Sequence, residues 1–345
     1  MNPMMYSVII SSLATGTIIT MTSHHWLLAW LGLEINTLAI IPTMSMKHNP
    51  RATEAAMKYF LTQTAASAMI LFASTTNAWY TGTWNIMQTS TTQSHILLTL
   101  ALAMKLGLAP MHFWLPEVLQ GTTMPTAMIL VTWQKLAPMS LIYMTISNLS
   151  TTLLLMLGLI SSMIGGWAGL NQTQTRKMMA FSSIAHLGWM ATVASIMTNI
   201  LILNLMIYLT MTMTMFYSLI LSKTKSIKDT TTSWTLSPML TTIMMLTLLS
   251  LGGLPPLTGF MPKWLILEEL TMQNLSPLAI LMALSSLLSL FFYLRLTYMT
   301  ALTLSPNTLL TKHKWRFKPT ITTTPLMILI PLTTLMLPIT PMTIA

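Results

Sequence analysis

The sequence predicts an all-α integral membrane protein with about eleven transmembrane helices and an internal repeat. Of its 345 residues, 53% are hydrophobic and only 6% are charged, whereas a soluble domain contains about 25% charged residues. Many apolar runs reach the roughly 20 residues that a helix needs to cross a bilayer. A short Gly/Pro pattern also occurs twice, each time inside such a run. These observations leave little room for a soluble domain.

Eleven apolar segments are long enough to be predicted as spans. A single polytopic membrane domain is therefore expected over residues 1–345. The expected spans lie near residues 3–22, 26–44, 57–78, 96–119, 125–147, 150–170, 178–198, 199–221, 237–267, 276–302 and 322–344.

The repeated Gly/Pro pattern predicts two discontinuous helices. When the segment from Gly107 to Glu117 is aligned with the segment from Gly253 to Lys263, the glycine, the leucine that follows it and two prolines coincide. This alignment predicts a first repeat at about 26–147 with a broken helix at 96–119, and a second at 150–302 with a broken helix at 237–267. A C-terminal helix at 322–344 follows. Broken helices in corresponding positions of two halves are typical of a transport site.

The basic residues of the loops predict the orientation in the membrane. With eleven alternating spans, every Lys or Arg that lies in a loop falls on the same side, and the loops of the other side contain none. By the positive-inside rule, the N-terminus and the basic loops face the compartment of synthesis. There is no basic stripe with stacking aromatic residues, so the net charge of +10 does not indicate nucleic-acid binding. The loop cations are Lys47, Arg51, Arg176, Lys177, Lys223, Lys225, Lys228, Lys312, Lys314, Arg316 and Lys318.

Several classes of function are excluded by missing residues and motifs. Cysteine is absent, so a disulfide, a thiol nucleophile and an iron–sulfur site are not expected in this chain. The sequence also contains no phosphate-binding or dinucleotide-binding motif. We therefore expect no bond-making chemistry, no metal site and no cofactor in this chain. Two hydrophilic loops, at 222–237 and 303–321, are expected to be solvated or to contact anionic lipid headgroups.

Four charged residues lie deep in the predicted spans: Glu34, Lys105, Lys135 and Lys263. A charge at the middle of a membrane costs about 2.5–3.5 kcal/mol on insertion scales, so such residues usually have a function. A buried Glu–Lys pair can hold a proton and release it when the pair opens. Two structural alternatives remain: a static ion pair that fixes helix register, and kinked packing with lysines that extend to the membrane surface.

Three further residues are candidates for supporting roles. His112 lies in the first Gly/Pro pattern and His186 in the seventh span, and imidazole can relay protons near neutral pH. A membrane histidine can equally serve as a hydrogen-bonding group between helices. Lys58 follows Glu54 by four residues, a spacing that suits an ion pair on a helix.

The motifs that contain these residues resemble subunit 2 of the NADH dehydrogenase family of mitochondrial respiratory complex I, in its animal, vertebrate-like form. The resemblance covers nearly the whole chain. Its motifs are WLGLEINTLAIIP, EAAMKYFLTQ, KLGLAPMHFWLPEVLQG, FSSIAHLGWM and LSLGGLPPLTGFMPKW.

The resemblance implies an antiporter-like subunit with two inverted repeats that translocates protons in the mitochondrial inner membrane, its N-terminus and basic loops in the matrix. It assigns proton loading to Glu34 with Lys105, the central relay to Lys135 and the far half-channel to Lys263. Lys58, His112 and His186 match the family pattern as supporting positions.

The same resemblance places NADH, FMN, iron–sulfur clusters and ubiquinone in other subunits. Implied partners are membrane-arm and accessory subunits and phospholipids including cardiolipin. Two alternatives stay open: a stand-alone cation/proton antiporter, and a structural scaffold whose ion path is vestigial.

Overall fold

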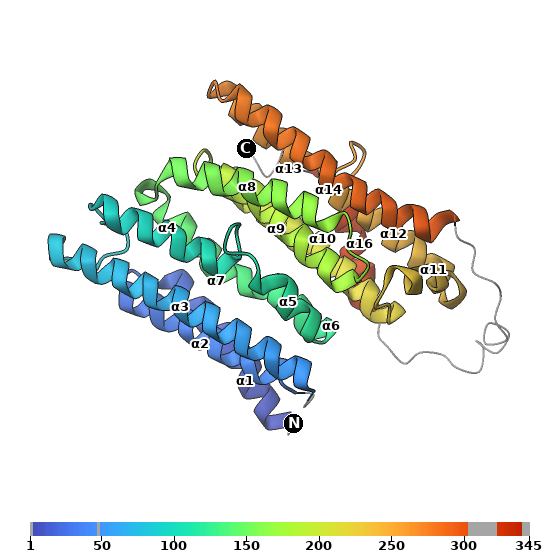
Figure 1. Ribbon diagram of the computed structural model, residues 1–345, viewed down its shortest axis with the longest axis horizontal. Helices are drawn as coiled ribbons and strands as arrows, with labels where there is room; N and C mark the ends of the chain where they lie inside the picture. The colour runs from blue at the N-terminus through green and yellow to red at the C-terminus, as the bar shows by residue number, and fades with distance from the viewer. Residues whose placement is uncertain (1–2, 47–48, 303–322, 340–345) are drawn as a thin grey trace. The chain divides into compact units, whose positions relative to one another are not determined.

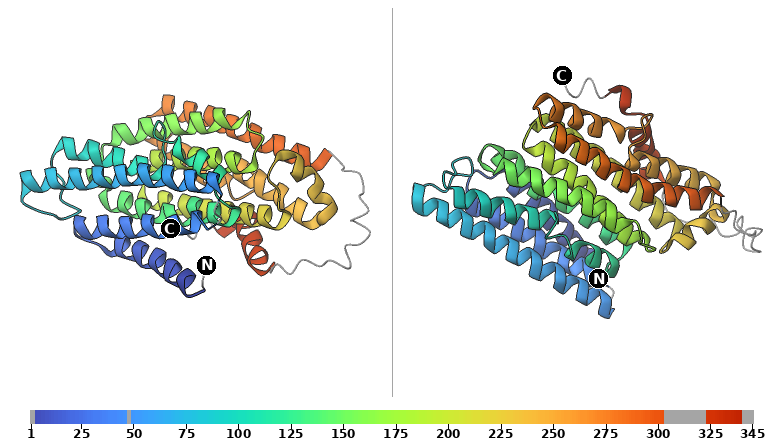
Figure 2. Two further views of the ribbon diagram at one scale, coloured as in Figure 1. Left: turned by 60° about the horizontal axis from the view of Figure 1, so that its bottom comes forward. Right: turned by 45° about the horizontal axis from the view of Figure 1, so that its top comes forward.

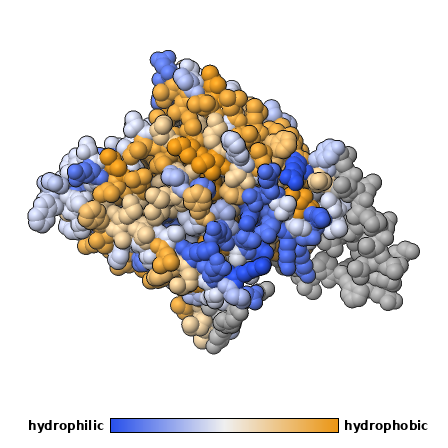
Figure 3. Space-filling model, in the orientation of Figure 1, coloured by the Kyte–Doolittle hydropathy of each residue, from blue (hydrophilic) through white to orange (hydrophobic). Residues whose placement is uncertain are grey.

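The computed structural model describes residues 3–46, 49–302 and 323–339, and it forms two compact units, 1–161 and 162–345 (Figure 1). In these described residues the regular structure is helical, with two isolated β-bridges between loops. Apolar side chains cover much of the surface visible in Figure 3. The all-helical membrane fold predicted from the sequence is therefore confirmed.

The first unit packs its helices around α3. This long helix contacts α2, α4 and α5, and α1 packs on α2 and α7 (Figures 1 and 2). The α1–α2 contact is very close, because a β-carbon on Gly32 would lie 2.9 Å from the carbonyl oxygen of Gly16. The elements are α1 (Pro3–Thr22), α2 (Trp26–Met44), α3 (Pro50–Thr81), α4 (Thr92–Leu106), α5 (Trp114–Gly121), α6 (Met124–Val131), α7 (Trp133–Thr145), the 3-10 helix η1 (Ile146–Asn148) and the first part of α8 (Thr151–Gly169).

The second unit packs around α9 and α10, both largely buried. The remainder of α8 lies against α9, since a β-carbon on Gly165 would lie 2.6 Å from the backbone nitrogen of Ala185. Helix α16 contacts α10 and α12. The further elements are α9 (Thr175–Ala194), α10 (Thr198–Ser222), α11 (Ile227–Leu236), α12 (Pro238–Gly252), α13 (Phe260–Met272), α14 (Ser276–Leu302), α16 (Thr324–Thr334) and the 3-10 helix η2 (Leu337–Ile339).

In each unit a helix ends and restarts at the Gly/Pro pattern, as predicted. We call residues 107–113 the first break and residues 253–259 the second break. Gly107 and Gly253 both have a φ of +80°, a left-handed conformation that favours glycine. The N–H of each glycine donates to carbonyls one turn back, at 2.9 and 3.2 Å for Gly107 and at 3.1 and 3.0 Å for Gly253. Both helices thus end in the same C-terminal turn.

Three differences between the predicted spans and the observed helices change the element assignment. The expected span 125–147 is interrupted at Thr132, which has φ −104° and ψ −70° and separates α6 from α7. The hydrophilic loop expected at 222–237 contains α11. In the C-terminal span expected at 322–344, α16 has 11 residues, and the end of that span lies outside the described residues, as does the loop expected at 303–321.

The predicted number of eleven spans is not confirmed. By length and composition, five helices of the described chain could each cross a membrane. The breaks and the interruption at Thr132 divide other predicted spans into shorter helices, which explains part of the difference. The five helices are α1, α2, α8, α10 and α14.

Loops that the charge pattern assigns to the same side contact each other. In the first unit, the cation-free loop at His25 forms a β-bridge with Asn85. In the second unit, Gln174 in the loop next to Arg176 bridges Ser226, which lies between Lys225 and Lys228. In both units the paired loops are those that follow the first and the third helix of the unit. The contacts agree with the predicted alternation of the spans.

Helix α11 begins with a local capping motif. The polar composition of this segment predicts a loop instead. The Ser226 side chain accepts a hydrogen bond from the Asp229 N–H, and the Asp229 carboxylate accepts from the Ser226 N–H at 2.9 Å. Burial acts to raise the pKa of Asp229, but the hydrogen bonds from the backbone of Ser226 and Lys225 lower it below its ordinary 3.8. The carboxylate is therefore ionised at neutral pH and stabilises the start of the helix.

We expect Ser226→Ala to loosen α11, because loss of a cap costs a helix about 0.5–2 kcal/mol. Amide hydrogen exchange of residues 227–236 should become faster in the variant. The matched control is Thr231→Ala, an exposed hydroxyl of the same helix that bonds only one turn back, to Lys228 at 2.7 Å. Equal exchange in the two variants would contradict a capping role for Ser226.

Candidate functional site

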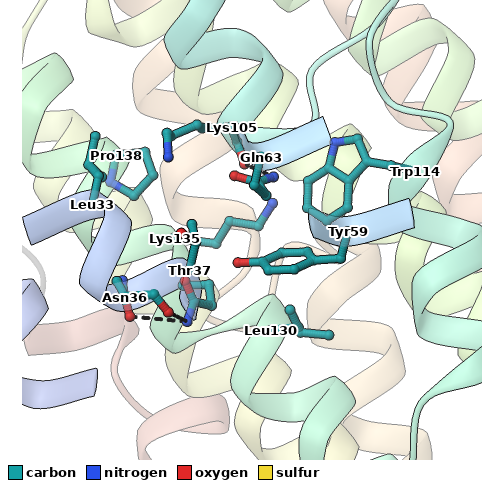
Figure 4. A pocket seen from close by; sticks show the side chains of 11 residues that line it. Leu33, Asn36, Thr37, Tyr59, Gln63, Lys105, Trp114, Leu130, Lys135 and Pro138 are labelled. Atoms are coloured by element: carbon teal, nitrogen blue, oxygen red, sulfur yellow. Dashed lines mark hydrogen bonds between the residues drawn. The ribbon is translucent and has the colours of Figure 1, made fainter. Parts of the chain in front are cut away.

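A small polar cavity lies beside the first break. Its volume is about 10 Å³, which is room for roughly one water molecule. Figure 4 shows the side chains of Lys105, Lys135, Tyr59 and Gln63 around this space. The lining comes from α2, α3, α4, α5, α6 and α7: Leu33, Asn36, Thr37, Tyr59, Gln63, Lys105, Trp114, Leu130, Gln134, Lys135 and Pro138.

Lys105 lies in the last turn of α4 and is 5% exposed. Within the described part of the chain, its Nζ has no hydrogen-bond partner. Glu34 acts electrostatically on both Lys105 and Tyr59, but no ion pair within 4.0 Å joins Glu34 to Lys105 among the described residues. The carboxylate is thus near the lysine without a direct contact.

Lys135 reaches the end of α4 from α7. Its Nζ donates to the backbone carbonyl of Leu106, the residue immediately before Gly107. The ammonium also lies 5.9 Å from the centre of the Trp114 ring, within the range of a cation–π contact. Because α4 ends inside the protein, its last carbonyls have no further turn of helix to donate to them. Lys135 therefore supplies both a donor and a positive charge at the negative end of a helix dipole.

The second break has the same arrangement with a lysine from a different position. Lys263 is 9% exposed, and its Nζ donates at 2.9 Å to the carbonyl of Gly252, the residue immediately before Gly253. In the repeat alignment Gly252 corresponds to Leu106, so both lysines bind equivalent carbonyls. Lys263 itself aligns with Glu117. A carboxylate cannot donate to a carbonyl, and in the first break the donor comes from α7 instead.

Glu117 forms an ion pair with Lys58 on the surface of the first unit. The Lys58 Nζ lies 2.6 Å from a carboxylate oxygen of Glu117 and 2.6 Å from one of Glu54. The predicted pair of Glu54 and Lys58 is confirmed. These side chains are 41–62% exposed, so Lys58 does not line the cavity. It joins α3 to α5, the helix that restarts after the first break.

The two histidines lie near the breaks. His112 lies in the first break and is 4% exposed, and the centre of its ring lies 4.3 Å from the centre of the Phe113 ring. His186 lies on α9, 5.6 Å from the Tyr208 ring, and it interacts electrostatically with Lys263. Each histidine therefore belongs to the surroundings of one break.

The cavity lining includes residues that were not predicted as site residues, among them Tyr59 and the amide residues Asn36, Gln63 and Gln134. The Gln134 amide donates to the side-chain oxygen of Asn36 at 3.1 Å and to its backbone carbonyl at 3.3 Å, as dashed lines show in Figure 4. Gln63 reaches the Lys105 carbonyl at 3.5 Å. The signal in the sequence was an amide side chain inside an apolar run, which alone does not distinguish a site from a packing contact.

Comparison with known proteins identifies the family. The family model described as NADH:quinone oxidoreductase/Mrp antiporter matches residues 23–289, and the model for the NADH dehydrogenase subunit 2 C-terminus matches 290–344. The NADH-ubiquinone oxidoreductase chain 2 of Latimeria chalumnae is 56% identical, with 100% of this chain and 99% of that protein covered. The chain belongs to the NADH-ubiquinone oxidoreductase chain 2 family.

Two solved structures are similar to this chain in fold. A chain of respiratory complex I from Thermus thermophilus superposes with a TM-score of 0.78 at 26% identity, covering 88% of this chain and 72% of that one. A chain of an archaeal membrane-bound sulfane sulfur reductase has a TM-score of 0.82 at 18% identity, covering 98% of this chain and 74% of that one. The second match shows a shared fold.

We expect Gly253→Ala to disturb the second break more than Gly82→Ala disturbs its own helix end. Both positions have positive φ, +80° and +72°, so both variants carry a backbone strain of about 1–2 kcal/mol. A β-carbon on Gly253 would also lie 2.9 Å from the Lys263 Nζ, whereas nothing lies within 4 Å of one on Gly82. Thermal unfolding of the isolated complexes would measure the difference. Equal losses would show that the Lys263 contact with the break adds no stability.

Proposed function

We propose that this chain is a proton-translocating membrane-arm subunit of NADH:ubiquinone oxidoreductase, the enzyme for which its relatives are named. The observation that carries the proposal is the pair of buried lysines, Lys135 and Lys263, each bound to the carbonyl that precedes the left-handed glycine of a break. A buried ammonium that is held by one carbonyl has a defined place to gain or lose a proton.

Two electrostatic effects support proton transfer here: the attraction between a lysine ammonium and a helix C-terminus, and the repulsion between two neighbouring ammonium groups. A protonated lysine stabilises the carbonyl end of its broken helix, and that stabilisation weakens when the proton leaves. Lys105 and Lys135 line one cavity, so a proton that loads Lys105 raises the energy of the charge on Lys135. The cavity has room for about one water molecule to connect them.

We assign the roles in the order that the family resemblance implies. Glu34 and Lys105 load the proton, Lys135 is the central relay, and Lys263 delivers it toward the far half-channel. His112 and His186 support the transfer beside their breaks. Lys58 supports it from the surface, because its ion pair with Glu117 holds α5 in place.

The units also support a pair of inverted repeats. The break at α4–α5 matches that at α12–α13, and in both halves the loop after the first helix bridges the loop after the third. The bridged loops are cation-free in the first half and basic in the second. The same feature on opposite sides of the membrane is what inverted topology produces. The first repeat then contains α1 in addition to residues 26–147.

The wider setting follows from the family. We infer a multi-pass protein of the mitochondrial inner membrane, with the N-terminus and basic loops in the matrix. NADH, FMN, iron–sulfur clusters and ubiquinone act in other subunits of the complex, and the chain contacts membrane-arm and accessory subunits. The basic loops favour phospholipids with anionic headgroups, such as cardiolipin.

A stand-alone antiporter for Na⁺ or K⁺ is less well supported. Two ammonium groups line the cavity, and the Leu106 carbonyl that could bind a metal cation accepts from Lys135. A scaffold with a vestigial path does not account for two lysines on equivalent carbonyls, because a purely structural role favours apolar packing over buried charge.

We predict that Lys135→Met and Lys263→Met each lower proton translocation per NADH oxidised, because methionine fills a similar volume without a proton. The measurement is acidification of liposomes that contain the assembled complex, alongside the rate of NADH oxidation. Lys228→Met, at an exposed position in the first turn of α11, is the matched control and should pump normally. Full pumping by both buried-lysine variants would refute the assigned roles.

A further inference from the structure

The indole of Trp114 connects the two sides of the first break. Trp114 is the first residue of α5, and its Nε1 donates across the break to the carbonyl of Met104 in α4 at 3.2 Å. The ring is 8% exposed. A β-carbon on Gly107 would lie 3.3 Å from it, so the indole packs directly against the turn that ends α4.

The same indole contacts the lysine that binds this break. The Lys135 Nζ lies 5.9 Å from the ring centre, and the ring of Tyr59 meets the indole edge-on at 5.8 Å. A cation over an aromatic face is stabilised by the ring's electrons, most strongly for tryptophan. The position of the indole therefore affects how well the cavity holds a charged Lys135.

The second break does not need such a link. There the lysine belongs to the broken helix itself, since Lys263 on α13 reaches the Gly252 carbonyl at the end of α12. The residue aligned with Trp114 is Phe260, whose side chain has no N–H to donate. In the first break the lysine comes from α7, which is not part of the broken helix. A separate residue is therefore needed to couple the charge on that lysine to the geometry of the break.

We propose that Trp114 is a positioning residue that couples the geometry of the first break to the charge on Lys135. The inference rests on the proposed function. When α5 shifts relative to α4, the indole moves with α5, and the hydrogen bond to Met104 and the contact with Lys135 change together. Movement at the break thus changes the stability of the Lys135 charge.

The test uses the assembled complex in liposomes and measures protons moved per NADH oxidised. Trp114→Leu removes both the ring and the donor, and Trp114→Phe keeps a ring without the N–H. We expect pumping to decrease from the unsubstituted protein to Trp114→Phe to Trp114→Leu, with the Leu variant losing at least about half of what Lys135→Met loses. Trp79→Leu, at a side chain that is 88% exposed, is the control and should pump normally.

A double variant separates positioning from a general loss of structure. If Trp114 acts through Lys135, Trp114→Leu should cause no further loss of pumping when Lys135 is already Met. A further loss, or normal pumping by Trp114→Leu alone, would overturn the positioning role and leave the proposed function intact. Normal pumping by Lys135→Met would instead refute the proposed role of that lysine. If the Trp114→Leu variants do not assemble, Trp114→Phe replaces Trp114→Leu in the comparison, alone and combined with Lys135→Met, and the same outcomes apply.

Discussion

A helix that ends inside a membrane protein needs donors for its last carbonyl groups, and this requirement organises the structure around both breaks. Water satisfies such groups at the ends of ordinary helices, but a buried end must find partners within the protein. Here the last turn of α4 receives side chains from three other elements: Trp114, Gln63 and Lys135. The last turn of α12 receives Lys263. The same bond that completes the helix end also fixes a titratable group at a defined depth.

The two breaks show how one constraint can be met in two ways. At the aligned position in the helix after each break, α13 has Lys263 and α5 has Glu117, which forms an ion pair with Lys58. Glu117 cannot donate to the Leu106 carbonyl, and in the first unit Lys135 from α7 is the donor to it. This exchange places Lys135 in the same cavity as Lys105 and brings two ammonium groups into one small volume. An arrangement with two nearby positive charges is suited to passing protons singly, since occupation of one site disfavours occupation of the other.

Much of the fold could be predicted because membrane helices follow from composition and length. The first two helices have the predicted bounds, 3–22 and 26–44, and both breaks occur at the predicted glycines. The interruption at Thr132 and helix α11 were not predicted. Thr132 breaks an apolar run that contains no glycine at that point, and α11 depends on a capping motif in a polar segment. The hydrophobicity of such a run is similar whether its helix is continuous or interrupted. Tertiary contacts therefore determine whether the helix is interrupted.

The candidate site was predictable in its charges and unpredictable in its contacts. Charge inside an apolar run identified the lysines and Glu34, and their roles remain proposals. The partner of Lys135 could not be predicted, because Leu106 lies 29 residues away and its carbonyl resembles any other in the sequence. Trp114 was overlooked because an aromatic residue in a membrane helix usually serves packing. Its importance depends on a lysine from another helix.

The most direct test of the account is a density map of the assembled complex at a resolution that resolves side chains and ordered waters. We expect the Nζ atoms of Lys135 and Lys263 to lie within hydrogen-bonding distance of the Leu106 and Gly252 carbonyls. We also expect ordered water between Lys105 and Lys135. Lysine side chains turned away from both helix ends, with a dry cavity between Lys105 and Lys135, would contradict the account.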